Sequence, residues 1–150
     1  MTFSRKVTCP YSCAVDRIPA EQFSDALQCA SCGRAMFAAK PVELTAAAFT
    51  ETIAGSELPV LVDFWAPWCG PCKAMATAFE KAALAMESRV RFAKLNTDEE
   101  QAIAQQFDIR SIPTMILFRD GQEIARHSGA LMGDAIERWA SEHLDAAVEA

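Results

Sequence analysis

The chain has 150 residues, of which 51% are hydrophobic, and a formal net charge of −6. This length can bury one medium-sized core and a small appended module. The acidic balance argues against nucleic-acid binding, because proteins that bind a phosphate backbone carry a basic surface. No apolar run reaches the length of a membrane span, and no apolar stretch of a secretory signal follows the basic residues near Met1. We therefore expect a cytoplasmic protein that binds neither nucleic acid nor membranes.

Cysteine usage divides the chain into two parts. Residues 1–38 hold Cys9, Cys13, Cys29 and Cys32 and contain few long apolar stretches. This segment therefore needs a stabilising cross-link in addition to apolar burial. In a reducing compartment, paired cysteines indicate a metal site or catalysis more often than structural disulfides. The spacing is typical of a zinc ribbon, in which four thiolates surround the ion as a tetrahedron. Disulfide pairing and a disordered tail are the alternatives.

Residues 39–150 show the pattern of a separate α/β domain. The strands expected are 41–44, 59–66, 90–96, 114–118 and 123–128. Thr45 is expected to cap a first helix that ends at Gly55. The further helices expected are 69–86, 99–107 and 132–147. The stretch 59–66 is almost continuously apolar, as expected for a central strand covered on both faces. Asp120-Gly121 is a hairpin signal between the last two strands. This order predicts a mixed central sheet flanked by helices.

The segment Trp68-Cys69-Gly70-Pro71-Cys72-Lys73 places two thiols between an apolar strand and a helix. Thiol–disulfide exchange needs a thiolate, and the unpaired N–H groups and dipole of a helix N-terminus favour the charged sulfur. We expect Cys69 to be the exposed nucleophile and Cys72, one turn into the helix, to be the more covered resolving thiol. The alternative is half of a metal site, because Cys-x-x-Cys also binds zinc.

Asp63 lies in the apolar strand just before this motif. A carboxylate buried there would lose hydration, so its pKa would rise and it could relay a proton for Cys72. The alternative is an aspartate at a strand end that faces solvent. Alternation along the strand cannot decide between the two, because the neighbours on both sides are apolar.

Residues 40–150 resemble the thioredoxin family. The resemblance rests on three segments, which are Phe64 to Lys73, Ile109 to Thr114, and Ser128-Gly129-Ala130. With the cysteine-rich segment in front, the whole chain resembles the thioredoxins that carry an N-terminal zinc-binding extension. The resemblance implies a thioredoxin fold with a small zinc ribbon. It also implies a monomeric protein disulfide reductase that acts on disulfide-containing proteins and is recharged by thioredoxin reductase and NADPH.

The resemblance also implies roles for residues around the cysteine pair. It implies that Lys94 pairs with Asp63, although Lys94 could equally be an ordinary strand lysine. It implies a cis peptide bond at Pro113, whose neighbour Ile112 would pair through its backbone with an extended substrate strand. The dipeptide between the cysteines would hold the pair reducing. The substrate-binding residues implied are Trp68, Gly70, Pro71, Ile112, Pro113 and Gly129.

The first cysteine pair departs from the pattern of that extension. The family usually has two residues between these cysteines, whereas three separate Cys9 and Cys13, so that Ser12 occupies the usual ligand position. Cys13 is therefore the weakest of the four expected ligands. The alternative functions are an oxidase or isomerase, and a redox-sensing or partner-recruiting module in which the ribbon provides the binding surface.

Overall fold

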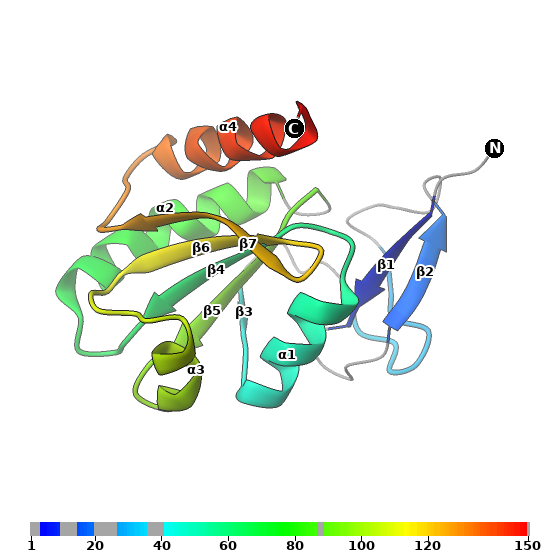
Figure 1. Cartoon of the computed structure of the whole chain (residues 1–150), viewed down its shortest axis with the longest axis horizontal. Coiled ribbons are helices and arrows are strands. Elements are labelled where there is room, and N and C mark those ends of the chain that lie inside the picture. The colour runs from blue at the N-terminus through cyan, green and yellow to red at the C-terminus, as the bar shows by residue number, and fades with distance from the viewer. Residues whose placement is uncertain (1–3, 10–14, 20–26, 36–40, 87–88, 150) are drawn as a thin grey trace.

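In the computed structural model, the described residues are 4–9, 15–19, 27–35, 41–86 and 89–149 (Figure 1). In chain order, the elements are β1 Ser4–Thr8, β2 Val15–Pro19, β3 Val42–Glu43, α1 Ala46–Gly55, β4 Val60–Trp65, α2 Gly70–Met86, β5 Arg91–Asn96, α3 Gln101–Gln106, β6 Thr114–Arg119, β7 Gln122–Ser128 and α4 Ala135–Glu149. Within these ranges no helix combines the length and apolarity needed to cross a bilayer.

The main sheet has five strands in the order β3-β5-β4-β6-β7. Strands β3, β5 and β4 run parallel, whereas β6 and β7 pair antiparallel, so the predicted mixed sheet is confirmed. Strand β4 lies at the centre, as its continuous apolar run predicts. Asp120 and Gly121 form the predicted hairpin turn with φ values of 52° and 78°, and positive φ at both central residues matches the twist of the flanking strands.

Each face of this sheet carries its own hydrophobic core. Residues Val60, Val62 and Phe64 of β4 pack with α1 and α3. Leu61, from the alternate set of the same strand, packs with α2 and α4. Figure 1 shows these two helix layers on opposite sides of the sheet. Because side chains alternate along a strand, this division also sets the direction in which each polar residue of β4 points.

Local hydrogen bonds explain where the helices begin. The hydroxyl of Thr45 accepts the N–H of Ala48 at 3.4 Å, which is the predicted cap of α1. Helix α3 starts at Gln101, two residues later than predicted, because the side chain of Asn96 accepts the N–H groups of the next turn. Helix α4 starts at Ala135 instead of residue 132, after Gly133 with φ +60°. A left-handed residue there is incompatible with an earlier helical start.

The N-terminal hairpin of β1 and β2 lies against the end of α1 and the loop that leads into β4. The backbone N–H of Glu57 donates to the carbonyl of Lys6 at 2.7 Å, and the N–H of Lys6 donates to a carboxylate oxygen of Glu57 at 3.1 Å. Leu58 is 1% exposed and packs in one apolar cluster with Cys9 and Cys29. The hairpin is therefore fixed to the main sheet where β4 begins.

Candidate functional site

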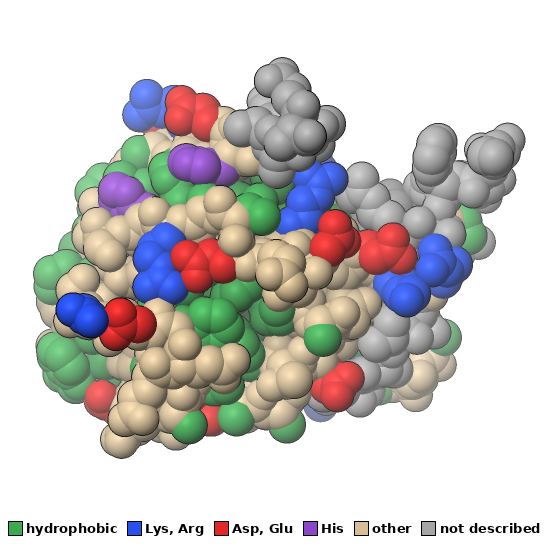
Figure 2. Space-filling model, viewed as in Figure 1, with side chains coloured by type: hydrophobic (Ala, Val, Ile, Leu, Met, Phe, Trp, Pro, Cys, Tyr) green, Lys and Arg blue, Asp and Glu red, His purple; other side chains and the backbone are tan. Residues whose placement is uncertain are grey.

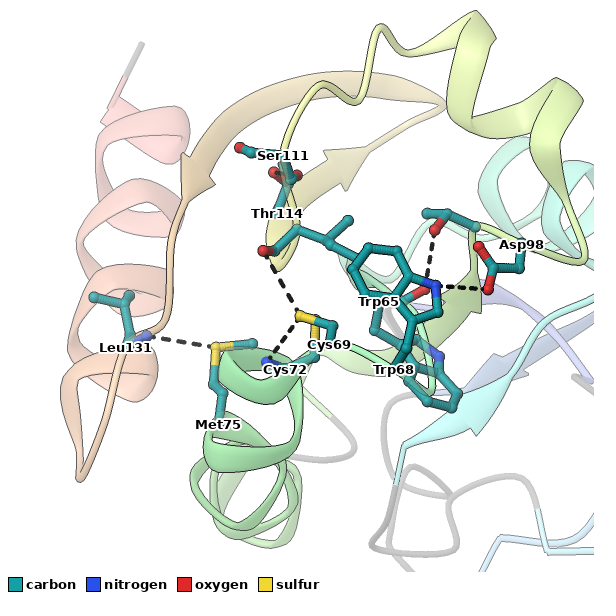
Figure 3. The surroundings of a disulfide bond; sticks show 11 residues. Trp65, Trp68, Cys69, Cys72, Met75, Asp98, Ser111, Thr114 and Leu131 are labelled. Carbon is teal, nitrogen blue, oxygen red and sulfur yellow. Dashed lines mark hydrogen bonds between the residues drawn. A yellow bond between two sulfur atoms is a disulfide. The ribbon is translucent and has the colours of Figure 1, made fainter.

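The predicted redox pair lies at the opposite end of β4, where α2 begins. Cys69 and Cys72 form a disulfide with a Cα–Cα distance of 5.3 Å (Figure 3). The carbonyl of Cys69 accepts the N–H of Lys73 at 3.1 Å, so Cys69 occupies the N-cap position of the helix. Its Sγ accepts the N–H of Cys72 at 3.2 Å, as a capping oxygen would. Once the disulfide is reduced, this N–H and the helix dipole favour a thiolate at Cys69, a direction already established for Cys-x-x-Cys pairs.

The expected difference in exposure between the two cysteines is wrong. Cys69 is 3% exposed and Cys72 is 4% exposed. Cys69 is covered because the loop before β6 packs against it, with the carbonyl oxygen of Ile112 only 3.8 Å from its Sγ. The residues beside it remain open, since Trp68 is 69% exposed and Gly70 also lies at the surface.

The residues expected to bind substrate meet beside the disulfide. The Ile112–Pro113 peptide bond is cis, as predicted. The N–H of Gly129 donates to the carbonyl of Pro113 at 2.9 Å, which joins the loop after β7 to the loop before β6. Gly129 has φ +100°, a backbone conformation that favours glycine. The structure thus brings these residues together with Trp68, Gly70 and Pro71 around one surface.

Two further residues fix this surface, and the sequence analysis did not identify either. The carboxylate of Asp98 accepts the indole N–H of Trp68 at 2.8 Å, which holds the exposed ring in place (Figure 3). The thioether of Met75 accepts the N–H of Leu131 at 3.4 Å, beside the Gly129 loop. Asp98 follows the end of β5, and the cysteines follow the end of the parallel strand β4. This shared end of the sheet is the feature from which the sequence could have placed Asp98 near the cysteines.

Asp63 is buried, with 1% of its surface exposed. It lies on the face of β4 that α2 covers, because it alternates with Val62 and Phe64, which pack on the opposite face. Its Oδ1 has no hydrogen-bond partner among the residues that the structure describes. Loss of hydration raises the pKa of Asp63 to about 7, while the charge of Lys94 opposes the rise. The strand-end alternative that faces solvent is therefore wrong.

Lys94 is opposite Asp63 in the parallel pairing of β4 and β5. Its ammonium group lies 4.2 Å from the ring centroid of Trp65, in a cation–π contact. Trp65 in turn packs against the buried cluster that contains both redox cysteines. Lys94 thus acts on Asp63 through its charge and also contacts the tryptophan beside the redox pair.

The second cysteine group lies next to Leu58, far from the disulfide. The Sγ atoms of Cys9, Cys29 and Cys32 are all within 4.8 Å of one another. Cys29 and Cys32 belong to a tight turn in which the N–H of Gly33 donates to the carbonyl of Cys29 at 2.8 Å. Gly33 has φ +77°, a backbone conformation that favours glycine and lets the chain turn after Cys32. Cys13, the fourth expected ligand, is outside the described residues.

These three sulfurs could hold a metal ion, and the spacing of one pair matches tetrahedral zinc. A Zn–S bond of about 2.3 Å in a tetrahedron places neighbouring sulfurs about 3.8 Å apart. The Sγ atoms of Cys9 and Cys32 are 3.7 Å apart. A backbone hydrogen bond at Arg34 favours the thiolate of the exposed Cys32, but partial loss of hydration and the interactions with Cys9 and Cys29 outweigh it and raise the pKa of Cys32. A bound cation would offset the repulsion between neighbouring thiolates and so favour their ionised form.

A mixed sheet, a disulfide at the start of a helix and an adjacent cis-proline loop together define a thiol–disulfide oxidoreductase. The family model described as Thioredoxin matches residues 40–142. The chain therefore belongs to the thioredoxin family and has the thioredoxin fold, with Cys69 and Cys72 as its active pair.

Individual relatives agree with this assignment. Thioredoxin C-3 of Corynebacterium nephridii is 38% identical over 138 residues, which cover 92% of this chain and 94% of that protein. A thioredoxin of Synechocystis is 47% identical over 89 residues, which cover 59% of this chain and 83% of that protein. The solved structure of a Malassezia sympodialis thioredoxin superposes with a TM-score of 0.62 at 34% identity, covering 69% of this chain and 91% of that one.

Proposed function

We propose that this oxidoreductase works as a reductant of disulfide bonds in other proteins. The thiolate of Cys69 attacks one sulfur of the target disulfide, forms a mixed disulfide and expels the first target thiolate. The thiolate of Cys72 then attacks Sγ of Cys69, expels the second target thiolate and leaves the Cys69–Cys72 disulfide. Two electrons pass to the target, whose thiolates take up protons. The observation that carries this proposal is the Cys72 N–H directed at Sγ of Cys69.

We assign the proton transfer of the second step to Asp63. The thiol of Cys72 must lose a proton before it attacks, and Asp63 is the buried acid on the face of β4 that α2 covers. A carboxyl group with a pKa of about 7 exchanges protons readily near neutral pH. Lys94 supports the ionised form of Asp63 from the neighbouring strand.

The surface around the disulfide is the proposed substrate groove. Ile112 precedes the cis-proline and would offer its backbone to an extended segment of the target, as an added strand. The exposed ring of Trp68 supplies an apolar wall. A groove that binds main chain and flat apolar surface accepts many targets. The residues assigned to it are Trp68, Gly70, Pro71, Ile112, Pro113 and Gly129.

Membership of the family supports the proposal that thioredoxin reductase, at the expense of NADPH, restores the dithiol. We propose a cytoplasmic monomer whose partners are this reductase and disulfide-containing proteins. Nucleic acid is excluded from the proposal by the net charge of −6. Figure 2 shows basic side chains beside acidic ones on the face in view, in keeping with ion pairs such as Arg126–Glu123 and Arg138–Asp134. Such pairing leaves little unbalanced positive charge.

For the N-terminal part, we propose a zinc ribbon of residues 1–38 attached to a thioredoxin domain of residues 39–150. Cys9, Cys29 and Cys32 would hold the ion with Cys13 as the fourth ligand. Zinc would cross-link β1 to the turn at Gly33 and so replace the core that this small module lacks. The match to Thioredoxin C-3 covers 92% of the chain and so extends into this part. These features support assignment to the thioredoxin 2 type.

Reduction of insulin by dithiothreitol tests the proposed reaction. The intact protein should accelerate the reduction strongly, and Cys69→Ser should abolish the acceleration. Cys72→Ser should instead accumulate a mixed disulfide with insulin, because the first step proceeds without the second. Undiminished catalysis by Cys69→Ser would refute the proposal.

Metal analysis combined with thiol titration tests the zinc proposal. Protein purified under reducing conditions should contain close to one zinc per chain and only two rapidly reacting thiols. Cys13→Ser should weaken zinc binding without changing the insulin assay. Six rapidly reacting thiols and no bound metal would contradict the proposed site.

A further inference from the structure

Five residues form one row across the main sheet at the level of the buried acid. Glu43 on β3 pairs with Lys94 on β5, and Lys94 pairs with Asp63 on β4. Asp63 pairs in turn with Met115 on β6, and Met115 pairs with His127 on β7. Paired residues on adjacent strands point to the same face of a sheet. The row therefore places the two acidic residues on the strands to either side of Lys94.

The packing of β3 independently confirms the direction of Glu43. Its neighbours Val42 and Leu44 both belong to the core under α1 and α3. Alternation then directs Glu43 to the other face, the one that α2 covers and that Asp63 shares. Burial increases inward along the row, since Glu43 is exposed, Lys94 is half-buried and Asp63 is 1% exposed.

We propose that Glu43 is a positioning residue for the buried acid, because it competes with Asp63 for the charge of Lys94 and so moves the loss of the Asp63 proton up to neutral pH, where Asp63 can both release and accept it. This inference rests on the proton role assigned above to Asp63. Two carboxylates that flank one lysine cannot both be fully compensated by its single charge. The outer carboxylate is hydrated and stays ionised at lower cost, so the inner one keeps its proton to a higher pH.

The other groups around the row are consistent with this division. The charge of Glu43 raises the pKa of Asp63 in addition to the larger effect of burial, whereas Lys94 lowers it. Burial also raises the pKa of Glu43, against the effects of Trp65 and Lys94, and Glu99 is the further acid that acts on it. Helix α2 contributes Cys72, whose sulfur could ionise only after reduction. It carries no charge while the disulfide is intact.

The test is the titration of Asp63 in the oxidised protein, followed by NMR of its carboxyl carbon and assigned with Asp63→Asn. Glu43→Gln keeps the shape of the side chain and removes its charge. Two strand spacings separate the two acids by about 10 Å, for which direct repulsion by Coulomb's law gives a fall of roughly 0.3 to 1.2 units in the pKa of Asp63, and competition for Lys94 adds to this fall. Glu80→Gln, on the exposed face of α2, changes the net charge equally and should leave that pKa unchanged. Equal titration midpoints in the two variants would overturn the inference.

A Lys94→Gln background separates competition for lysine from simple repulsion. If the two acids share the ammonium group, Glu43→Gln should lower the pKa of Asp63 less in this background than in the parent protein. An equal fall in both backgrounds would contradict the role given to Lys94. The titration is independent of turnover. A pH profile of insulin reduction that Asp63→Asn leaves unchanged would therefore refute only the proton role of Asp63, and a lowered pKa in Glu43→Gln would still support the present inference.

Discussion

Replacing Asp63 by Asn should stabilise the oxidised protein, and the gain should depend on pH in a defined way. The pKa of Asp63 is about 7 in the folded protein, against an ordinary value of 3.8. Between these values the unfolded chain releases a proton that the folded chain retains, so the free energy of unfolding of the parent falls as pH rises. The fall is about 1.4 kcal/mol per pH unit and about 4 kcal/mol in total. Asparagine cannot ionise, so the variant does not lose this stability.

Urea unfolding of the oxidised parent and of Asp63→Asn, measured at half-unit steps from pH 4 to pH 8.5, provides the assay. The difference in the free energy of unfolding should be small near pH 4, grow steadily and level off above about pH 7. Keeping the disulfide intact prevents the two thiols from contributing to the titration. A difference that stays constant over this range would refute the reasoning, because burial of a charge would then not be the cause.

Further predictions concern the two ends of β4. Leu58→Ala should lower the free energy of unfolding by about 2–4 kcal/mol through the cavity it leaves. It should also weaken zinc binding, because Leu58 packs in one cluster with Cys9. The control is Leu84→Ala, at a position 68% exposed, which should change neither quantity. Asp98→Ala should raise KM for insulin about fivefold, since it removes the hydrogen bond to Trp68, worth about 1 kcal/mol. Indole fluorescence anisotropy should fall in that variant, and an unchanged anisotropy would show that another contact fixes the ring.

The elements of the main domain were predictable because they are set by local patterns. The apolar run of β4, the helical spacing in α2 and the turn at Gly121 each fix an element without reference to distant residues. The cysteine pair was equally visible, because its chemistry depends on the spacing of two residues. Boundaries were less accurate where a side chain such as Asn96 caps a turn before the helix.

What the sequence did not reveal depends on register and on loop packing. The direction of Asp63 was undecidable because both neighbours in β4 are apolar, and only the packing of the two faces resolves it. Glu43 gains a relation to Asp63 only through the pairing of three strands. The expected exposure of Cys69 failed because no local pattern shows that the loop carrying Ile112 closes over the sulfur.

The two groups of cysteines lie at opposite ends of β4, whose six residues span roughly 20 Å. Of the cysteines that the structure describes, those near Leu58 therefore lie too far from Cys69 to take the place of Cys72. The length of β4 thus separates the redox disulfide from the three-cysteine group within one chain, and this distance disfavours disulfide exchange between them.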